Sequence, residues 1–155
     1  MTAQPAAEPT PERYAPPEPE LRALLGDART IAVVGLSSDP RRVSYRIARY
    51  LQDKGYRVVP VNPNETEVLG QRSYPSLRDV LPEVDIDVVD VFRRPEYTPD
   101  VARDAVAAGA KVLWLQSGIV NDEARQIAED AGLDVVMGVC IHDVAVRLEK
   151  EEAGR

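Results

Sequence analysis

The sequence has few of the residues that enzyme sites most often use. Its 155 residues include one cysteine, Cys140, and one histidine, His142. One cysteine excludes an intrachain disulfide, and with no secretory leader to be seen it is typical of a cytoplasmic protein. These two residues are also too few to predict a metal site, so none is expected.

Basic residues are scarce relative to acidic ones. The chain has 19 lysines and arginines against 26 acidic residues, a formal net charge of -7. A nucleic-acid partner is not expected, because it would require a broad basic surface. No membrane partner is expected either, because no apolar run approaches the roughly 20 residues of a membrane-spanning helix. A small anionic ligand remains compatible, since a few arginines can gather at one site.

The first twenty residues are rich in proline and glutamate and offer little apolar surface to bury. Proline also removes backbone hydrogen-bond donors. We therefore expect residues 1–20 to form a flexible tail and residues 21–152 to form one folded domain, which suits the chain length. The residues concerned are Pro5, Pro9, Pro11, Pro16, Pro17 and Pro19 with Glu8, Glu12, Glu18 and Glu20.

Beyond the tail, apolar runs alternate with amphipathic stretches. Helices between strands require crossover connections and hence a parallel sheet, and strands apolar on both faces require cover on both sides. The sequence therefore predicts an α/β fold: a single Rossmann-like, doubly wound parallel sheet of about five strands with helices on both faces. The predicted strands are 30–34, 56–61, 86–91, 111–115 and 133–137; the helices are 20–26, 43–54, 76–80, 99–108, 121–131 and 143–152; residues 67–70 form a turn or minor strand.

The turn after the first strand predicts an anion site. Ligands of open parallel sheets bind at the carboxyl ends of the strands. Gly35 permits a tight turn into a helix, whose N-terminal N–H groups and dipole attract anions. The alternative is that the glycine only turns the chain and a serine only caps the helix. The candidate residues of this turn and helix are Gly35, Leu36, Ser37, Arg41, Arg42, Ser44 and Tyr45.

Two groups of arginines are expected at the same edge. Arg41 and Arg42 follow the first strand, and Arg93 and Arg94 follow the third main strand. Arginine forks suit phosphate oxygens, so the two groups together indicate an anionic ligand. For each arginine alone, a surface ion pair with Asp39, Asp90 or Asp100 is the alternative.

The details of these turns favour coenzyme A over NAD. A dinucleotide fingerprint needs further glycines after the first, and an acid at the end of the second strand. Here Ser37 and Pro40 stand in the turn, and the second strand ends at Asn62. A nucleotide that has phosphates but does not need an acid to bind a free ribose diol fits better. Coenzyme A is such a nucleotide, because its ribose carries a 3′-phosphate.

Several motifs along the chain, taken in order, match those of a known protein family. The chain resembles the small bacterial and archaeal CoA-binding proteins, which are similar to the CoA-binding domain of the succinyl-CoA synthetase alpha subunit. The resemblance covers about Leu21 to Leu148, and the order and spacing of its motifs are more specific than any one of them. These motifs are Ile31–Ser37, Gly55–Pro63, Tyr74–Leu77, Val89–Pro95 and Trp114–Gly118.

The resemblance implies roles for these residues. Gly35, Leu36 and Ser37 would hold the phosphates of CoA. The other expected contacts are Val61, Asn62 and Pro63 at the adenosine end, Phe92, Arg93, Arg94 and Pro95 along the nucleotide cleft, and Gln116, Ser117 and Gly118 on the pantetheine side. The chain departs from the family where an Asp-Arg pair often precedes the last cysteine, because Gly138 and Val139 stand there. Any function of that pair is therefore in doubt.

No catalytic set is evident. Cys140 and His142 could form a thiol–imidazole pair, but the sequence shows no third group to orient the histidine. The sequence therefore favours a non-catalytic module that binds CoA or an acyl-CoA, and a homodimer is a reasonable default. An NAD(P)-binding Rossmann oxidoreductase is the main alternative, and a regulatory partner that uses the nucleotide as a signal is a third.

Overall fold

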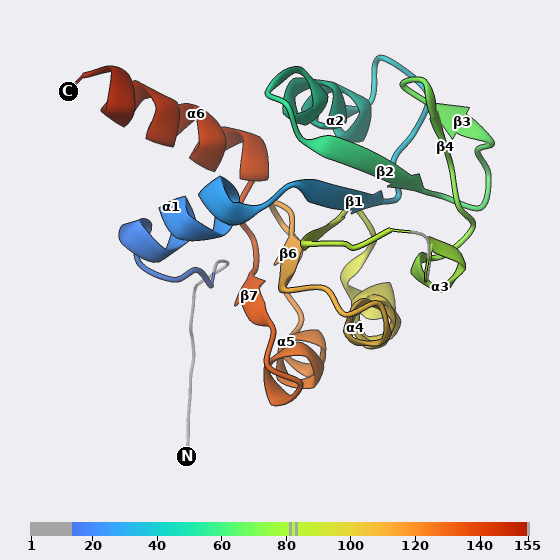
Figure 1. Ribbon diagram of the computed structural model, residues 1–155. Helices are drawn as coiled ribbons and strands as arrows, with labels where there is room; N and C mark the ends of the chain where they lie inside the picture. Colours follow the sequence, from blue (N-terminus) through green and yellow to red (C-terminus); the bar gives the residue numbers. More distant parts are fainter. Residues whose placement is uncertain (1–13, 81, 83, 155) are drawn as a thin grey trace.

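Five parallel strands form the central sheet in the order β2-β1-β5-β6-β7 (Figure 1). The computed structural model describes residues 14–80, 82 and 84–154. The strands of the sheet are β1 (Thr30–Val34), β2 (Arg57–Val61), β5 (Val88–Val91), β6 (Val112–Leu115) and β7 (Asp134–Val136). The helices are α1 (Glu18–Asp27), α2 (Val43–Asp53), α3 (Leu77–Val80), α4 (Thr98–Ala107), α5 (Asp122–Asp130) and α6 (Ile141–Ala153), with a 3₁₀ turn at Pro95–Tyr97.

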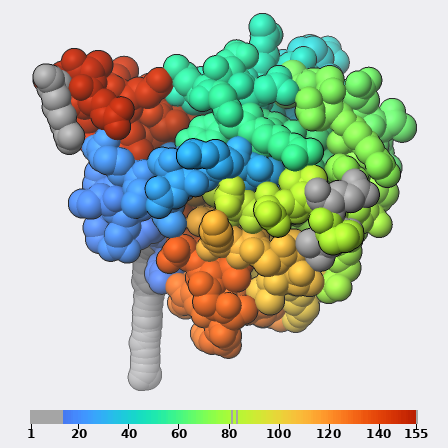
Figure 2. Space-filling view, viewed as in Figure 1, coloured from blue at the N-terminus to red at the C-terminus, as the bar shows by residue number. Residues whose placement is uncertain are grey.

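The helices cover the two faces of the sheet in two sets of three. Residues of α1, α2 and α6 pack with one set of strand side chains, and residues of α3, α4 and α5 pack with the other. Figure 2 shows the first set as one layer of blue, blue-green and red side chains. The predicted doubly wound α/β fold is therefore confirmed. No helix in the described part of the chain is long and apolar enough to cross a membrane.

Most element boundaries differ from the sequence prediction by one or two residues, and three differences change the description of the fold. Helix α1 begins at Glu18, and Tyr14 pairs with Met137 through two backbone hydrogen bonds of 2.8 and 2.7 Å. These residues of the predicted tail thus belong to the fold, whereas residues 1–13 lie outside the described part. Residues 67–70 lie in a hairpin of β3 (Glu67–Val68) and β4 (Gln71–Arg72). Helix α6 begins two residues before the predicted start.

The strand order indicates where along the carboxyl edge of the sheet a crevice opens. Strand β1 lies between β2 and β5, so the chain leaves β1 through α2 towards one side and later returns through β5 on the other. In open α/β sheets this reversal separates the two adjacent carboxyl ends and opens a crevice there. A ligand site is therefore expected at the carboxyl ends of β1 and β5.

Asp90 departs from the sequence expectation. A surface ion pair with an arginine was one alternative for this residue, but its side chain is fully buried. It stands in β5 between Val33 of β1 and Trp114 of β6, and neither carboxylate oxygen has a hydrogen-bond partner in the described part of the chain. Burial raises the pKa of Asp90 well above its ordinary value, so the folded protein holds this carboxyl in its neutral form.

The stability of an Asp90→Asn variant relative to the wild type should increase with pH. The unfolded chain ionises Asp90 above a pKa of about 3.9, whereas the folded chain keeps it protonated. The wild type therefore loses stability as pH rises from that value towards the raised folded pKa, and the Asn variant does not. Urea unfolding of both proteins between about pH 4 and about pH 8 measures this difference.

Asp87→Asn is the control, because the shift there has the opposite sign. Partial burial opposes ionisation of Asp87, but hydrogen bonds from the Thr30 and Arg29 N–H groups and from Lys111 outweigh it and lower the pKa. The stability that Asp87 contributes is present above its unfolded pKa and is lost as pH falls through the folded one. A pH-independent effect of Asp90→Asn would contradict the neutral buried carboxyl.

Candidate ligand site at the carboxyl edge of the sheet

Two chain segments meet where β1 and β5 end. Gly35 has a φ of +89°, and a Cβ placed on it would lie 2.5 Å from the Phe92 carbonyl oxygen. The Gly35 N–H donates to the Val61 carbonyl oxygen at 2.8 Å, and the Phe92 N–H donates to that of Val34 at 2.8 Å. Both the backbone conformation and the close approach therefore require glycine here.

The loop between β1 and α2 is held by its own side chains. The buried Ser44 Oγ accepts from the Ser37 N–H at 3.1 Å, and the Ser37 Oγ accepts from the Asp39 N–H at 3.0 Å. Asp39 in turn accepts from the Arg41 N–H at 2.9 Å. No side chain caps the first turn of α2, so the simple alternative of a serine cap does not hold. The loop is thus set before any ligand binds.

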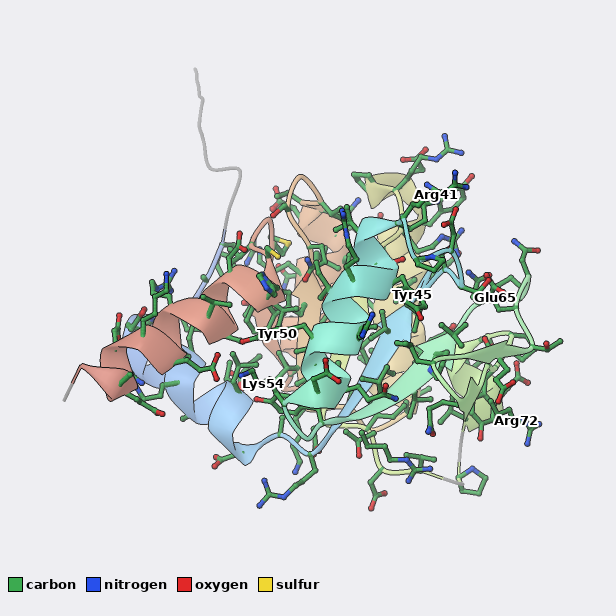
Figure 3. The ribbon with its side chains drawn as sticks, turned by 90° about the horizontal axis from the view of Figure 1, so that it is seen from above. Arg41, Tyr45, Tyr50, Lys54, Glu65 and Arg72 are labelled. Carbon is green, nitrogen blue, oxygen red and sulfur yellow. The ribbon has the colours of Figure 1, made fainter. Side chains whose placement is uncertain are left out.

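Asn62 and Glu65, which follow β2, also form hydrogen bonds to this loop. The Asn62 amide donates to the Leu36 carbonyl oxygen at 2.9 Å, which ties β2 to the loop after β1. The Glu65 carboxylate accepts from the Ser38 N–H at 2.8 Å. Figure 3 shows Arg41 and Glu65 at the end of the molecule where α2 begins. A backbone donor of the candidate anion loop is therefore already bound to a carboxylate of the protein itself.

The four arginines differ in how free they are. Arg41 is paired with Asp39, and this hydrogen-bonded pair lowers the pKa of the Asp39 carboxyl. Within the described residues, Arg42, Arg93 and Arg94 form no ion pair, although the guanidinium groups of Arg93 and Arg94 lie 4.7 and 5.8 Å from the Tyr97 ring. The sequence alternative of an ion pair thus holds for Arg41 alone among these four.

Two adjoining hollows open at this edge. The first, the loop groove, has a volume of about 560 Å³ and is lined by Gly35, Ser37, Arg41, Arg42, Val43, Ser44, Asn62, Asn64, Glu65 and Phe92. The second, the strand-end cleft, has a volume of about 380 Å³ and is lined by Val34, Gly35, Val61, Asn62, Pro63, Asn64, Pro75, Ser76, Leu77, Phe92, Arg93, Val101 and Asp104. They share Gly35, Asn62, Asn64 and Phe92, which follow β1, β2 and β5, so they form one continuous surface for an elongated ligand.

The structure brings most but not all of the predicted site residues together. Ten of them line one hollow or both: Gly35, Ser37, Arg41, Arg42, Ser44, Val61, Asn62, Pro63, Phe92 and Arg93. The other seven do not, for reasons visible in the fold. Leu36 is buried, Tyr45 packs half-buried on the core beneath α2, and Arg94 and Pro95 lead into the 3₁₀ turn.

The three residues after β6 lie away from both hollows. Gln116 is buried, and its side-chain oxygen accepts from the Ile141 N–H at 3.1 Å, so this side chain supports the start of α6. Ser117 and Gly118 form an exposed turn. Their place on the pantetheine side stays a prediction.

Several lining residues were not predicted as contacts, although Ser76 and Leu77 stand in one of the family motifs. Glu65 lies in the segment between β2 and β3, where no periodicity marks it. Ser76 and Leu77 reach the cleft because Tyr74 pairs beside the end of β2, and its N–H donates to the Pro60 carbonyl oxygen at 3.0 Å. Asp104 comes from the middle of α4 and pairs with Arg78 at 2.6 Å. Only the tertiary arrangement brings these residues to the strand ends.

The family of the chain follows from comparison with known proteins. Residues 29–143 match the family model described as a CoA binding domain, so the chain belongs to that family. The protein YneT of Bacillus subtilis (strain 168) is 41% identical over 126 residues, which cover 81% of this chain and 92% of YneT. The resemblance drawn from the sequence motifs is therefore confirmed at the level of the family.

Other relatives share the fold or a part of their length. A hypothetical protein from Pyrococcus horikoshii OT3 superposes with a TM-score of 0.81 at 39% identity, over 85% of this chain and 92% of that one. The acetate–CoA ligase (ADP-forming) II of Archaeoglobus fulgidus is 29% identical over 113 residues. Those residues are 72% of this chain but only 16% of the ligase, so the chain spans a small part of that enzyme.

Gly35→Ala should destabilise the protein more than Gly55→Ala does. Both glycines have a positive φ, of +89° and +100°, but a Cβ at Gly55 would meet nothing within 4 Å. The backbone strain, about 1–2 kcal/mol, is common to both variants. Only Gly35→Ala adds the clash with the Phe92 carbonyl oxygen, for a further loss of about 1–3 kcal/mol. Urea unfolding compares the two, and equal losses would show that the close approach is unimportant.

Proposed function

We propose that this protein binds coenzyme A, or an acyl-CoA, across the loop groove and the strand-end cleft. The observation that carries the proposal is the junction of the two hollows at Gly35, where backbone from β1 and β5 meets. The loop groove offers the start of α2 and the exposed Arg42 to a pyrophosphate. Membership of the CoA-binding-domain family and the likeness to part of an acetate–CoA ligase support the same ligand.

The strand-end cleft suits the adenosine part of the ligand. Its walls combine apolar side chains, such as Leu77 and Val101, with polar groups of Asn62 and Asn64. Small-molecule sites generally have this composition, with a few polar groups that fix orientation. Arg93 lines this cleft without an ion pair in the described part of the chain, and it is therefore our candidate for the 3′-phosphate.

We propose a binding module and not a complete enzyme. Among the described residues, neither hollow is lined by a histidine or a cysteine, and the acids present are Glu65 and Asp104. Glu65 binds a backbone N–H and Asp104 is paired with Arg78, so neither is free to act as a general base. The protein would then present CoA to a partner that catalyses a reaction, or sense CoA without any reaction.

Coenzyme A should raise the unfolding temperature, and NAD should not. A ligand that binds only the folded state at 100 times its Kd stabilises it by about 2.7 kcal/mol. The measurement is a thermal-shift series with CoA, dephospho-CoA, acetyl-CoA, NAD and NADP at equal concentrations. A weaker shift with dephospho-CoA would support a contact to the 3′-phosphate. No shift with any CoA species, or a shift with NAD alone, would overturn the proposal.

Arg93→Ala should weaken CoA binding more than Arg94→Ala does. Both arginines lie near the Tyr97 ring, but only Arg93 lines the strand-end cleft. A charge-assisted hydrogen bond contributes about 1.5–3 kcal/mol, which corresponds to a loss of affinity of roughly tenfold to 100-fold. Isothermal titration calorimetry with CoA measures both variants. Equal affinities would remove Arg93 from the site.

Glu65→Gln should strengthen CoA binding. The Glu65 carboxylate accepts from the Ser38 N–H in the loop groove, so a bound phosphate would have to displace it or lie beside it. Glutamine keeps the acceptor oxygen and removes the charge. Two like charges about 4 Å apart in water repel by about 1 kcal/mol, so the expected gain is about fivefold. Titration calorimetry at low salt measures it.

Glu67→Gln is the matched control for the overall charge. Glu67 is exposed on β3 and lines neither hollow. It should change the affinity for CoA little. If Glu65→Gln weakened binding, the Glu65 carboxylate would have to accept a hydrogen bond from the ligand, and its role as a competitor would be wrong.

A further inference from the structure

A third group of reactive side chains lies outside both hollows, in the turn between β7 and α6. The Cys140 sulfur, a ring nitrogen of His142 and a carboxylate oxygen of Asp143 all lie within 4.8 Å of one another. Cys140 precedes the first residue of α6, and the other two side chains belong to its first turn. None of the three lines the loop groove or the strand-end cleft.

Residues at the end of β6 hold the backbone of this turn through hydrogen bonds. The Gly138 N–H donates to the Leu115 carbonyl oxygen at 2.9 Å, and the indole N–H of the buried Trp114 donates to that of Val139 at 2.7 Å. The Gln116 side-chain oxygen accepts from the N–H of Ile141 at 3.1 Å. Three hydrogen bonds thus hold the residues on either side of Cys140, so the site is preorganised.

The imidazole of His142 is also held. Its ring packs edge to face on the Tyr50 ring, with centroids 4.5 Å apart and an interplanar angle of 71°. Tyr50 itself is anchored, because its hydroxyl donates to the Glu149 carboxylate at 2.8 Å. Figure 3 shows Tyr50 on α2 on the side that faces α6. The Nδ1 atom of His142 lies 3.2 Å from Asp143 Oδ1, which brings the carboxylate to the ring.

We propose that Cys140, His142 and Asp143 bind a divalent transition-metal ion such as Zn²⁺. Sulfur, nitrogen and oxygen donors together suit zinc and its neighbours, whereas Mg²⁺ and Ca²⁺ require oxygen ligands. In a tetrahedral zinc site, bond lengths of about 2.0–2.3 Å place neighbouring ligand atoms about 3.5 Å apart. Small side-chain rotations therefore close the present separations of up to 4.8 Å. One thiolate and one carboxylate balance the charge of the ion, and water would complete the coordination.

The triangular arrangement distinguishes a metal site from a nucleophilic relay. In a Cys-His-Asp relay the imidazole stands between the thiol and the carboxylate, and the two outer groups lie far apart. Here the sulfur, a ring nitrogen of the imidazole and the carboxylate oxygen all lie within 4.8 Å of one another, so the two outer groups of such a relay would not be far apart. Three donor atoms this close to one another favour a shared ion over a relay.

The site occupies the same edge of the sheet as the proposed CoA site but at its other end. Strand β7 is three strands away from β1 in the sheet order. At about 4.8 Å between neighbouring strands, the separation across the sheet is about 14 Å. Metal binding can therefore be measured without CoA, and its failure would leave the proposed function intact.

Cobalt titration of the reduced, metal-free full chain tests the proposal. Co²⁺ should bind with a stoichiometry of one and produce a thiolate-to-cobalt absorption band in the near ultraviolet with tetrahedral bands in the visible. One equivalent of Zn²⁺ should abolish both. Cys140→Ser should remove the near-ultraviolet band, and His142→Ala and Asp143→Asn should each weaken binding at least tenfold.

Asp130→Asn provides the matched control. Asp130 is an exposed acid at the end of α5 that accepts from the Gln126 amide, so its loss should leave cobalt binding unchanged. The His142 side chain is 39% exposed, and its removal is not expected to unfold the protein; circular dichroism checks this for every variant. An absent thiolate band, or unchanged affinity in both His142→Ala and Asp143→Asn, would overturn the site. A rapid reaction of Cys140 with thiol reagents that neither metal affects would favour a nucleophile instead.

Discussion

The close approach of Gly35 to the Phe92 carbonyl oxygen is the constraint on which the candidate site depends. A Cβ at Gly35 would come within 2.5 Å of that oxygen, so only glycine lets the chains from β1 and β5 leave the sheet side by side. Because these strands lie on either side of the reversal in the strand order, both hollows open at this point. Backbone sterics therefore determine where a ligand can lie, before any side chain contributes chemistry.

Polar side chains around this point form hydrogen bonds within the protein, and two of them, Ser44 and Asn62, also line a hollow. Ser44, Asn62 and Asp39 each hold a backbone group of the β1–α2 loop. Their hydrogen bonds keep the loop in one conformation without ligand, which lowers the entropy cost of binding. The same arrangement reduces the charge available to an anion, because Asp39 occupies Arg41 and Glu65 occupies the Ser38 N–H. The free charge of the loop groove thus rests on Arg42.

The sequence could predict the sheet and the edge where the candidate site lies, because both follow from local patterns. Strands apolar on both faces indicate a covered parallel sheet, and Gly35 marks the turn after β1. The position of a residue along that edge depends on strand order, which the patterns do not contain. Gln116 follows a strand as Phe92 does, but β6 lies beyond β5, and there the Gln116 side chain binds the start of α6 instead of lining a hollow. Glu65 was not predicted, because it reaches Ser38 only through the conformation of its loop, which no sequence periodicity indicates.

Ligands of open parallel sheets bind at the carboxyl ends of the strands, but the strand ends of this sheet differ in their hydrogen-bond partners. At the ends of β1 and β2, hydrogen bonds within the protein hold the loop before α2, and side chains after β1, β2 and β5 line open space. At β6 the side chains of Trp114 and Gln116 extend to the turn before α6 and fill that space with protein. Both are buried, so the loss of either partner would leave an unpaired polar group in the core. The β6 end therefore supports the turn that carries Cys140, while the β1 and β5 ends remain open to a ligand.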